Sequence, residues 1–179
     1  MKLAAMRLRQ RDGITCGPTV AVVAGALLDA DYRAALIEPG ASSVAAAGRL
    51  WFADEQARVH RDANRWWPRR LGTTPMGMAH ALSACGLRRG VRYGWRLFRG
   101  RRDPMHDVVR AVGDGLPVAM LIGRFIPRHW VLILEADDDF LQCYEPSSGE
   151  VMPVRIAAVR RSLIAGLGYP RPFAFVLPR

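Results

Sequence analysis

Apolar residues recur along this chain at spacings that predict helices first and a mixture of helices and strands later. The segment 16–30 is apolar on nearly all sides, which is typical of a helix buried at the centre of a domain. Helices are also predicted over 44–63 and 73–86, where Ser or Thr residues provide start signals. Two more helices are predicted over 103–113 and 156–164.

Strands are predicted in the second half of the chain. Residues 91–97 alternate between apolar residues and Arg or Gly, which predicts a half-buried strand with arginines on its outer face. The apolar runs 118–122 and 173–177 are typical of buried strands, and 151–154 is a further short strand. No repeat or linker interrupts the chain, so residues 1–179 are expected to form one domain.

Two apolar segments, 129–134 and 140–145, flank an acidic turn and predict a β-hairpin. A five-residue loop over 135–139 sets the register and places His129 opposite Glu145. Directly opposed residues have Cβ atoms about 5 Å apart, so the pattern predicts a histidine–carboxylate contact at the open end of the hairpin. The same register pairs Ile133 with Leu141, Val131 with Cys143, and Trp130 with Tyr144.

Cys16 lies where a loop becomes the first apolar helix. The free N–H groups and the dipole at a helix N-terminus favour a thiolate over a thiol. Gly17 has no side chain, so a substrate backbone could approach closely, and Pro18 fits the first helical turn. Gln10, six residues upstream, could offer its amide to an oxyanion beside the Cys16 N–H. The alternative is a buried cysteine on a helix face.

Cys16, His129 and Glu145 form a candidate nucleophile, general base and orienting carboxylate, in that order along the chain. A histidine beside the cysteine would hold the thiolate as an ion pair and later protonate the leaving group. In the competing interpretation, Glu145 is only a strand-end carboxylate, and Gln142 or a backbone carbonyl orients the histidine.

The net charge of +10 raises the question of nucleic-acid binding. Nearly all basic residues are arginine and Lys2 is the only lysine, which is typical of codon bias in a GC-rich genome. Seven arginines fall within 88–102, but their alternation with apolar residues favours a solvated strand face over a nucleic-acid strip. We therefore do not expect nucleic acid as a partner.

The three cysteines, Cys16, Cys85 and Cys143, are far apart and odd in number. They form neither a disulfide framework nor a C-x-x-C zinc pattern, so we expect no metal and no cofactor, and a reducing compartment. No signal-peptide core and no run of transmembrane length is present. The expectation is a cytoplasmic protein, or one exported by a specialised non-Sec route, with no membrane partner.

These motifs resemble those of the papain-like cysteine peptidases. The resemblance is closest to the branch that cleaves double-glycine leaders from bacteriocin precursors and to its stand-alone bacterial relatives. That branch has a Gln before Cys-Gly at the spacing of Gln10 and Cys16, and a His that opens an apolar strand, as His129 does. Its Asp-Pro at the end of the next strand corresponds to Glu145-Pro146 here, with Glu in place of the usual Asp.

The resemblance spans residues 10–154 and implies an α+β fold in which N-terminal helices, one bearing the cysteine, pack on an antiparallel sheet. It implies hydrolysis of a peptide or protein substrate through an acyl-enzyme, and we expect Gly17 and Trp130 to contact that substrate. Papain-like folds also support deamidation, transglutamination and acyl transfer, so an enzyme acting on a protein partner as an effector or toxin is an alternative. A non-enzymatic basic interaction module on this fold is a second alternative.

Overall fold

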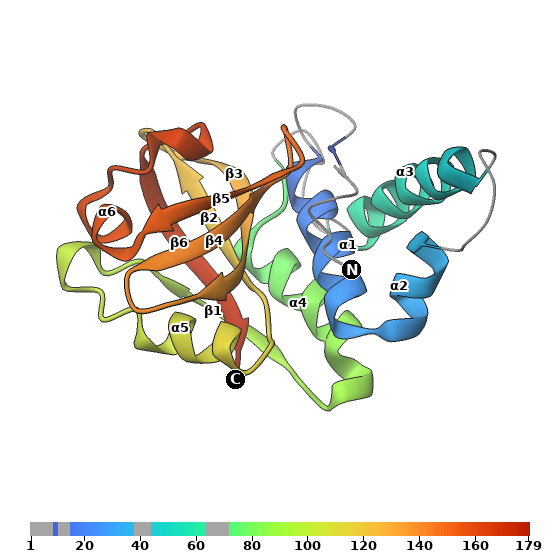
Figure 1. Cartoon of the computed structure of the whole chain (residues 1–179), viewed down its shortest axis with the longest axis horizontal. Helices are drawn as coiled ribbons and strands as arrows, with labels where there is room; N and C mark the ends of the chain where they lie inside the picture. The colour runs from blue at the N-terminus through green and yellow to red at the C-terminus, as the bar shows by residue number, and fades with distance from the viewer. Residues whose placement is uncertain (1–8, 11–14, 38–43, 64–71) are drawn as a thin grey trace.

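The protein is described by a computed structural model at residues 9–10, 15–37, 44–63 and 72–179. Helices α1 to α4 lie on one side of the molecule and a twisted sheet on the other (Figure 1). The tandem tryptophans Trp66 and Trp67, which could line a groove or plug the surface, lie outside the described residues. The helices are α1 Cys16–Leu28, α2 Ala30–Ile37, α3 Val44–Ala63, α4 Pro75–Gly86, α5 His106–Gly113 and α6 Ile156–Arg161.

The sheet has six strands in the order β1-β6-β2-β3-β4-β5, and every neighbouring pair is antiparallel. Helices that pack on an antiparallel sheet confirm the expected α+β fold. Short 3₁₀ turns occupy Leu87–Arg89, Gly100–Arg102 and Ala165–Leu167. The strands are β1 Tyr93–Leu97, β2 Val118–Gly123, β3 Pro127–Ala136, β4 Phe140–Glu145, β5 Glu150–Arg155 and β6 Arg171–Pro178.

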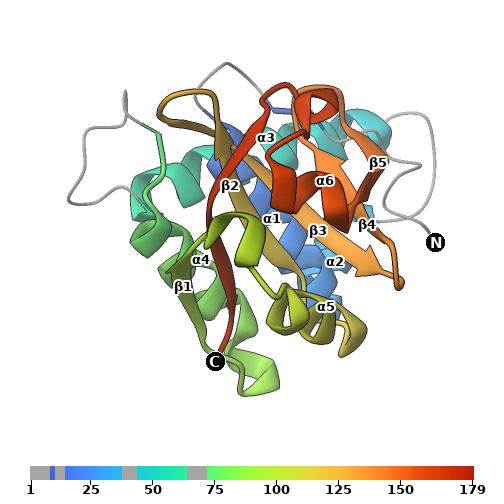
Figure 2. The same cartoon turned by 90° about the vertical axis from the view of Figure 1, so that its left-hand side faces the viewer.

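The sheet separates two hydrophobic cores. Helix α1 is buried along almost its whole length, as its apolar sequence predicts, and it packs between α3, α4 and β3. Side chains such as Trp130 and Leu132 join it from one face of β3, whereas Val131 and Ile133 point to the core under α5 and α6. In Figure 2, α5 and α6 lie in front of the sheet and α1 lies behind it. This layering fixes the N-terminus of α1 against the start of β3.

The predicted helix starts and ends are largely confirmed, with one omission. Helix α3 has the predicted bounds, and α4 begins as its sequence indicates, since the Thr74 hydroxyl accepts a hydrogen bond from the Gly77 N–H, with Pro75 in the first turn. The sequence reading missed α2. The first helix ends at Leu28, and the Asp29 carboxylate then caps a new helix by accepting the N–H of Asp31.

In the outer strand β1, the prediction that the arginines lie on the exposed face is wrong for Arg96. Trp95 and Leu97 are 40% and 65% exposed, while the Arg96 side chain is only 16% exposed. Arg96 lies over the ring of Phe175 and pairs with Asp103 at 2.7 Å, and with a second carboxylate from α5. Helices cover both faces of the sheet, so strand alternation alone could not predict which face of this edge strand is buried.

The predicted hairpin forms, but its register is shifted by two residues. Ile133 lies opposite Cys143, and a bulge at Leu134 adds one residue to β3. The turn is also tighter than predicted, because the Asp137 carboxylate accepts the Phe140 N–H at 2.6 Å. The predicted division of faces is nevertheless right, since Val131, Ile133, Leu141 and Cys143 share one core. The predicted opposed pairs are wrong, because Cys143 lies opposite Ile133 and Tyr144 lies opposite Leu132. On the other edge of β3, Trp130 and His129 lie opposite Leu121 and Ile122 of β2.

Candidate active site

The candidate nucleophile, Cys16, is the first residue of α1 and is 4% exposed. The Thr15 side chain makes no capping hydrogen bond to this helix, although the Thr15 carbonyl accepts the Thr19 N–H and hydroxyl. The first N–H groups of a helix have no partner within the helix, so those beside Cys16 are oriented toward any anion formed there. The local sequence therefore places the sulfur beside two features that stabilise negative charge, namely backbone donors and the helix dipole.

His129 contacts both other candidate residues. Its Nε2 hydrogen-bonds Glu145 Oε1 at 2.8 Å, and a second hydrogen bond joins its ring to Cys16. Because Nε2 bonds to Glu145, we assign the hydrogen bond with Cys16 to the other ring nitrogen, Nδ1. The ring is 7% exposed, and this burial opposes protonation, but the bonds to Cys16 and Glu145 outweigh it and raise the pKa of His129 to about 9. The imidazole is therefore a cation at neutral pH.

Glu145 is held by the turn that follows it. The Ser147 and Ser148 N–H groups each donate to one of its carboxylate oxygens at 2.8 Å. Burial opposes ionisation of this group, but the bond to His129 and the backbone N–H bonds lower the pKa of Glu145 to about 2. The carboxylate is thus a fixed anion at any pH near neutrality, and its orientation is set by the backbone of residues 147–148.

The turn after Glu145 also binds the segment that carries Gln10. The Gln10 N–H donates to the Pro146 carbonyl at 2.8 Å, and the Arg9 guanidinium donates to the Ser148 carbonyl at 2.7 Å. From the other side, the Gln56 amide of α3 donates to the Arg9 carbonyl at 3.4 Å. The Gln10 Oε1 is buried and has no hydrogen-bond partner among the described residues. One turn therefore orients the histidine through Glu145 and anchors the backbone of Gln10.

Gly17 and Trp130, which the sequence predicts to contact substrate, are buried and lie where α1 approaches β3. A Cβ at Gly17 would lie 2.4 Å from the Thr73 hydroxyl oxygen and 3.3 Å from the Trp130 ring. Trp130 is 1% exposed, and its indole N–H donates to the Thr73 carbonyl at 2.9 Å. The space beside Gly17 is thus filled by the protein itself. The two residues allow α1 to approach β3 closely, which brings Cys16 to His129.

The other cysteines lie in environments that disfavour a thiolate. Burial raises the pKa of Cys85 to about 11 and that of Cys143, in the middle of β4, to about 12. Cys85 lies in an interhelical pocket with Tyr32 and Arg58, away from His129 in sequence and in contacts. The environment of Cys16, which includes a cationic imidazole, differs from both.

Sequence reasoning missed four contributors to this site. These are the backbone of Ser147 and Ser148, the guanidinium of Arg9 and the ring of Tyr169, whose centroid lies 5.9 Å from that of His129. The turn residues after Glu145-Pro146 were a usable signal, because a Pro-Ser-Ser-Gly run offers free backbone N–H groups. Arg9 and Tyr169 carried no local signal, since their contacts join segments distant in sequence.

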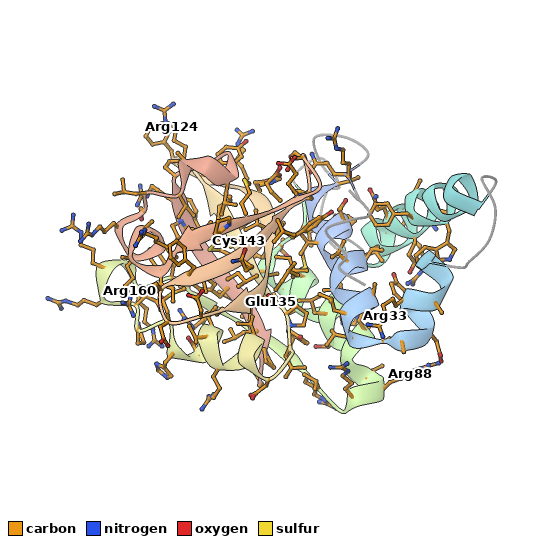
Figure 3. All side chains as sticks on the ribbon, viewed as in Figure 1. Arg33, Arg88, Arg124, Glu135, Cys143 and Arg160 are labelled. Atoms are coloured by element: carbon orange, nitrogen blue, oxygen red, sulfur yellow. The ribbon has the colours of Figure 1, made fainter. Side chains whose placement is uncertain are left out.

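Arginine side chains are spread over the surface of the described structure, as Arg88, Arg124 and Arg160 show at its periphery in Figure 3. Among the residues described, no three His, Cys, Asp or Glu side chains gather in a way that could hold a metal ion. Within the same residues, no helix combines the length and apolar character needed to span a membrane.

Comparison with known proteins found no matching family model and no matching curated protein. Among solved structures, the chain is similar to the peptidase domain of Streptococcus ComA, a bi-functional ABC transporter involved in a quorum-sensing pathway. The two are 15% identical with a TM-score of 0.48, and the match covers 96% of this chain and 97% of that one. A similarity of this degree carries no conclusion about this chain by itself.

Proposed function

We propose that this protein is a papain-like cysteine peptidase that hydrolyses a peptide or amide bond through an acyl-enzyme on Cys16. The observation that carries the proposal is the line of contacts from Cys16 to His129 to Glu145. A buried imidazolium between a cysteine and a fixed carboxylate is costly unless it is fully paired, and here both ring nitrogens have partners. The Cys16-Gly17, His129 and Glu145-Pro146 motifs follow one another along the chain in the order typical of papain-like cysteine peptidases, which supports the same assignment.

In the proposed reaction, the Cys16 sulfur attacks the substrate carbonyl carbon and pushes its electrons onto the oxygen. The Cys16 N–H and the Gln10 side-chain amide donate to this oxyanion. His129 then gives its proton to the leaving nitrogen as the C–N bond breaks, which leaves a thioester. A water molecule, deprotonated by His129, attacks the thioester, and its collapse releases a carboxylic acid and restores the thiolate. Glu145 keeps the imidazole oriented and stabilises its cation throughout.

Reactivity of the three thiols provides the first test. Iodoacetamide near neutral pH should modify Cys16 before Cys85, although Cys85 is the more exposed of the two. The reason is that alkylation requires a thiolate, and burial raises the pKa of Cys85 far above neutrality. Mass spectrometry of tryptic peptides identifies the labelled residue. Equal labelling of all three cysteines would refute the assignment of Cys16.

Hydrolysis provides the decisive test. A fluorogenic peptide library should yield substrates that the wild type and Cys85→Ala cleave and that Cys16→Ala does not. Gln10→Ala should lose about 2–4 kcal/mol of transition-state stabilisation, as expected for an oxyanion donor. Product analysis with and without an added primary amine then distinguishes hydrolysis from acyl transfer, because a hydrolase releases mainly the free acid in both cases, whereas a transferase yields mainly the amide when the amine is present. Cleavage that survives in Cys16→Ala would exclude this mechanism.

A further inference from the structure

A groove of about 610 Å³ runs between one side of α4 and the outer strand β1. Met76, His80 and Ser83 line its helical wall and fall on one stripe of α4, which Leu87 of the following 3₁₀ turn continues. Tyr93 and neighbouring residues of β1 form the opposite wall. A groove between a helix and a free strand edge is the geometry in which proteins bind extended peptides by strand addition.

The backbone of β1 offers unused hydrogen-bonding groups on that side. Arg92 and Phe98 bond to β6 at 2.9 Å, so the alternation of an antiparallel ladder turns Tyr93, Trp95 and Leu97 away from β6. The Tyr93 N–H donates to the Ser83 hydroxyl, and the Leu97 carbonyl accepts from Arg96. Within the described residues, the Trp95 N–H and carbonyl and the Leu97 N–H have no recorded partner. These three groups could pair with a short guest strand.

Exposed apolar side chains gather around this edge. Of the seven large apolar side chains that are exposed in the described structure, four lie on α4, on β1 or just beyond α4. Two of them, Trp95 and Leu97, belong to the same face of β1, opposite Val176 and Ala174 of β6. A concentration of this kind beside an open edge indicates an interaction surface. The four are Met76 at 71%, Leu87 at 69%, Trp95 at 40% and Leu97 at 65%.

The other face of the same edge is positively charged. Arg92 lies opposite Arg179, and the Arg179 side chain fills the space that a side chain at Gly94 would take. Both arginines line the groove, whose lining includes no Asp or Glu side chain, and among the described residues neither guanidinium forms an ion pair with such a side chain. The edge thus presents apolar side chains on one face and unpaired cations on the other.

We propose that this groove binds an extended acidic segment of a partner protein, which adds a strand to the edge of β1. Apolar residues of the segment would face Trp95 and the α4 stripe, and the acidic residues between them would face Arg92 and Arg179. A second copy of this chain is a poorer fit, because it would bring the same cations against one another. The site is independent of the catalytic proposal, since β6 and β2 separate β1 from the strand that carries His129.

A fluorescein-labelled peptide of alternating Val and Glu provides a probe for this groove. Fluorescence polarisation with the full chain should show saturable binding at physiological salt. The same peptide with N-methyl groups on alternate residues keeps the side chains but loses the backbone bonds, and it should bind about tenfold more weakly. A Val–Lys peptide should not bind. Equal binding of the Glu and N-methyl peptides would overturn strand addition.

Variants locate the site. Arg92→Glu with Arg179→Glu should weaken binding of the Val–Glu peptide at least tenfold, whereas Arg161→Glu, an exposed residue of α6, should not. Thermal unfolding shows whether each variant remains folded. Binding that is unchanged in the double variant, or that is lost after alkylation of Cys16, would place the peptide elsewhere and overturn the proposal. Self-association of the chain that prevents the Val–Glu peptide from binding would also overturn the proposal.

Discussion

At the residue scale, the register of the hairpin explains how the Glu145 carboxylate reaches His129. Continuing the Ile133–Cys143 pairing places Val131 opposite Glu145, so His129 lies diagonally, two residues further along β3. Diagonal neighbours are about 7–8 Å apart, within the reach of long side chains. The extra methylene of Glu145 spans this distance and gives a 2.8 Å bond. Glu145→Asp would keep the charge but shorten the reach.

The pH dependence of Cys16 alkylation tests the His129–Glu145 bond. The pKa of His129 is raised to about 9, so the imidazolium persists at neutral pH and is lost as the pH rises through about 9. Glu145→Gln removes the anion and one of the two bonds that raise the pKa of His129, so His129 should lose its proton at a lower pH. When the rate constant of Cys16 alkylation is measured against pH, the change that accompanies loss of the His129 proton should therefore occur at a lower pH in this variant than in the wild type.

Glu150→Gln is the matched control for this experiment, because Glu150 lies opposite Glu145 on β5 but is exposed. Its profile should match that of the wild type, since it removes one carboxylate without touching the histidine. Superimposable profiles for Glu145→Gln and the wild type would show that Glu145 does not set the protonation of His129.

A second prediction at the residue scale is that Arg9 positions the segment that carries Gln10. Its guanidinium fixes the segment of Gln10 on the turn that also clamps Glu145. Arg9→Ala should lower kcat about tenfold by loosening the oxyanion donor, with little change in KM. Alkylation of Cys16 needs no oxyanion donor, so its rate and pH profile should stay unchanged. Arg9→Lys should restore part of kcat, and Arg110→Ala, an exposed arginine on α5, should have no effect. A parallel loss of alkylation would indicate a general structural role instead.

At the scale of elements, apolar periodicity predicted most helices and strands, because each pattern is local. The bounds of α3 and the cap of α4 at Thr74 are correct for this reason. Register and contacts between distant segments could not be predicted in the same way. The bulge at Leu134 depends on the Asp137 turn, and the bond from Arg9 to Ser148 joins residues 139 positions apart. The sequence therefore predicted which residues form the candidate site, but it did not predict the contacts that hold them in place.

The close approach of α1 to β3 yields a prediction about stability. Gly17→Ala would place a Cβ 2.4 Å from the Thr73 hydroxyl oxygen, in a buried site where neither partner is the tip of a long side chain. Overpacking of this kind should lower the free energy of unfolding by about 1–3 kcal/mol. Urea denaturation followed by circular dichroism measures it. Gly113→Ala, in α5 with open space around it, should not destabilise the protein. An unchanged midpoint for Gly17→Ala would mean that α1 is not held against Thr73 as described.

At the scale of the whole molecule, the arginines that the structure describes are not all available to an outside partner. Several arginines form ion pairs within the chain, such as Arg58 with Glu55, Arg88 with Asp29 and Arg96 with Asp103. Arg160 donates to backbone carbonyls that precede α5. Two other arginines, Arg33 and Arg124, lie on different parts of the molecule (Figure 3). A net charge of +10 spread in this way favours weak, non-specific attraction to polyanions over a defined footprint.

Nucleic-acid binding should therefore be weak, with only a shallow dependence on salt. The α4–β1 groove supplies only two unpaired arginines, Arg92 and Arg179, for a backbone of phosphates. Two phosphate contacts on a single strand correspond to a slope of about −1.4 in log K against log salt. Fluorescence anisotropy with a labelled single-stranded RNA should show no submicromolar complex at physiological salt. A submicromolar complex that is lost in Arg92→Ala with Arg96→Ala would contradict this expectation, because Arg96 is already occupied by two carboxylates and has little charge to offer a phosphate.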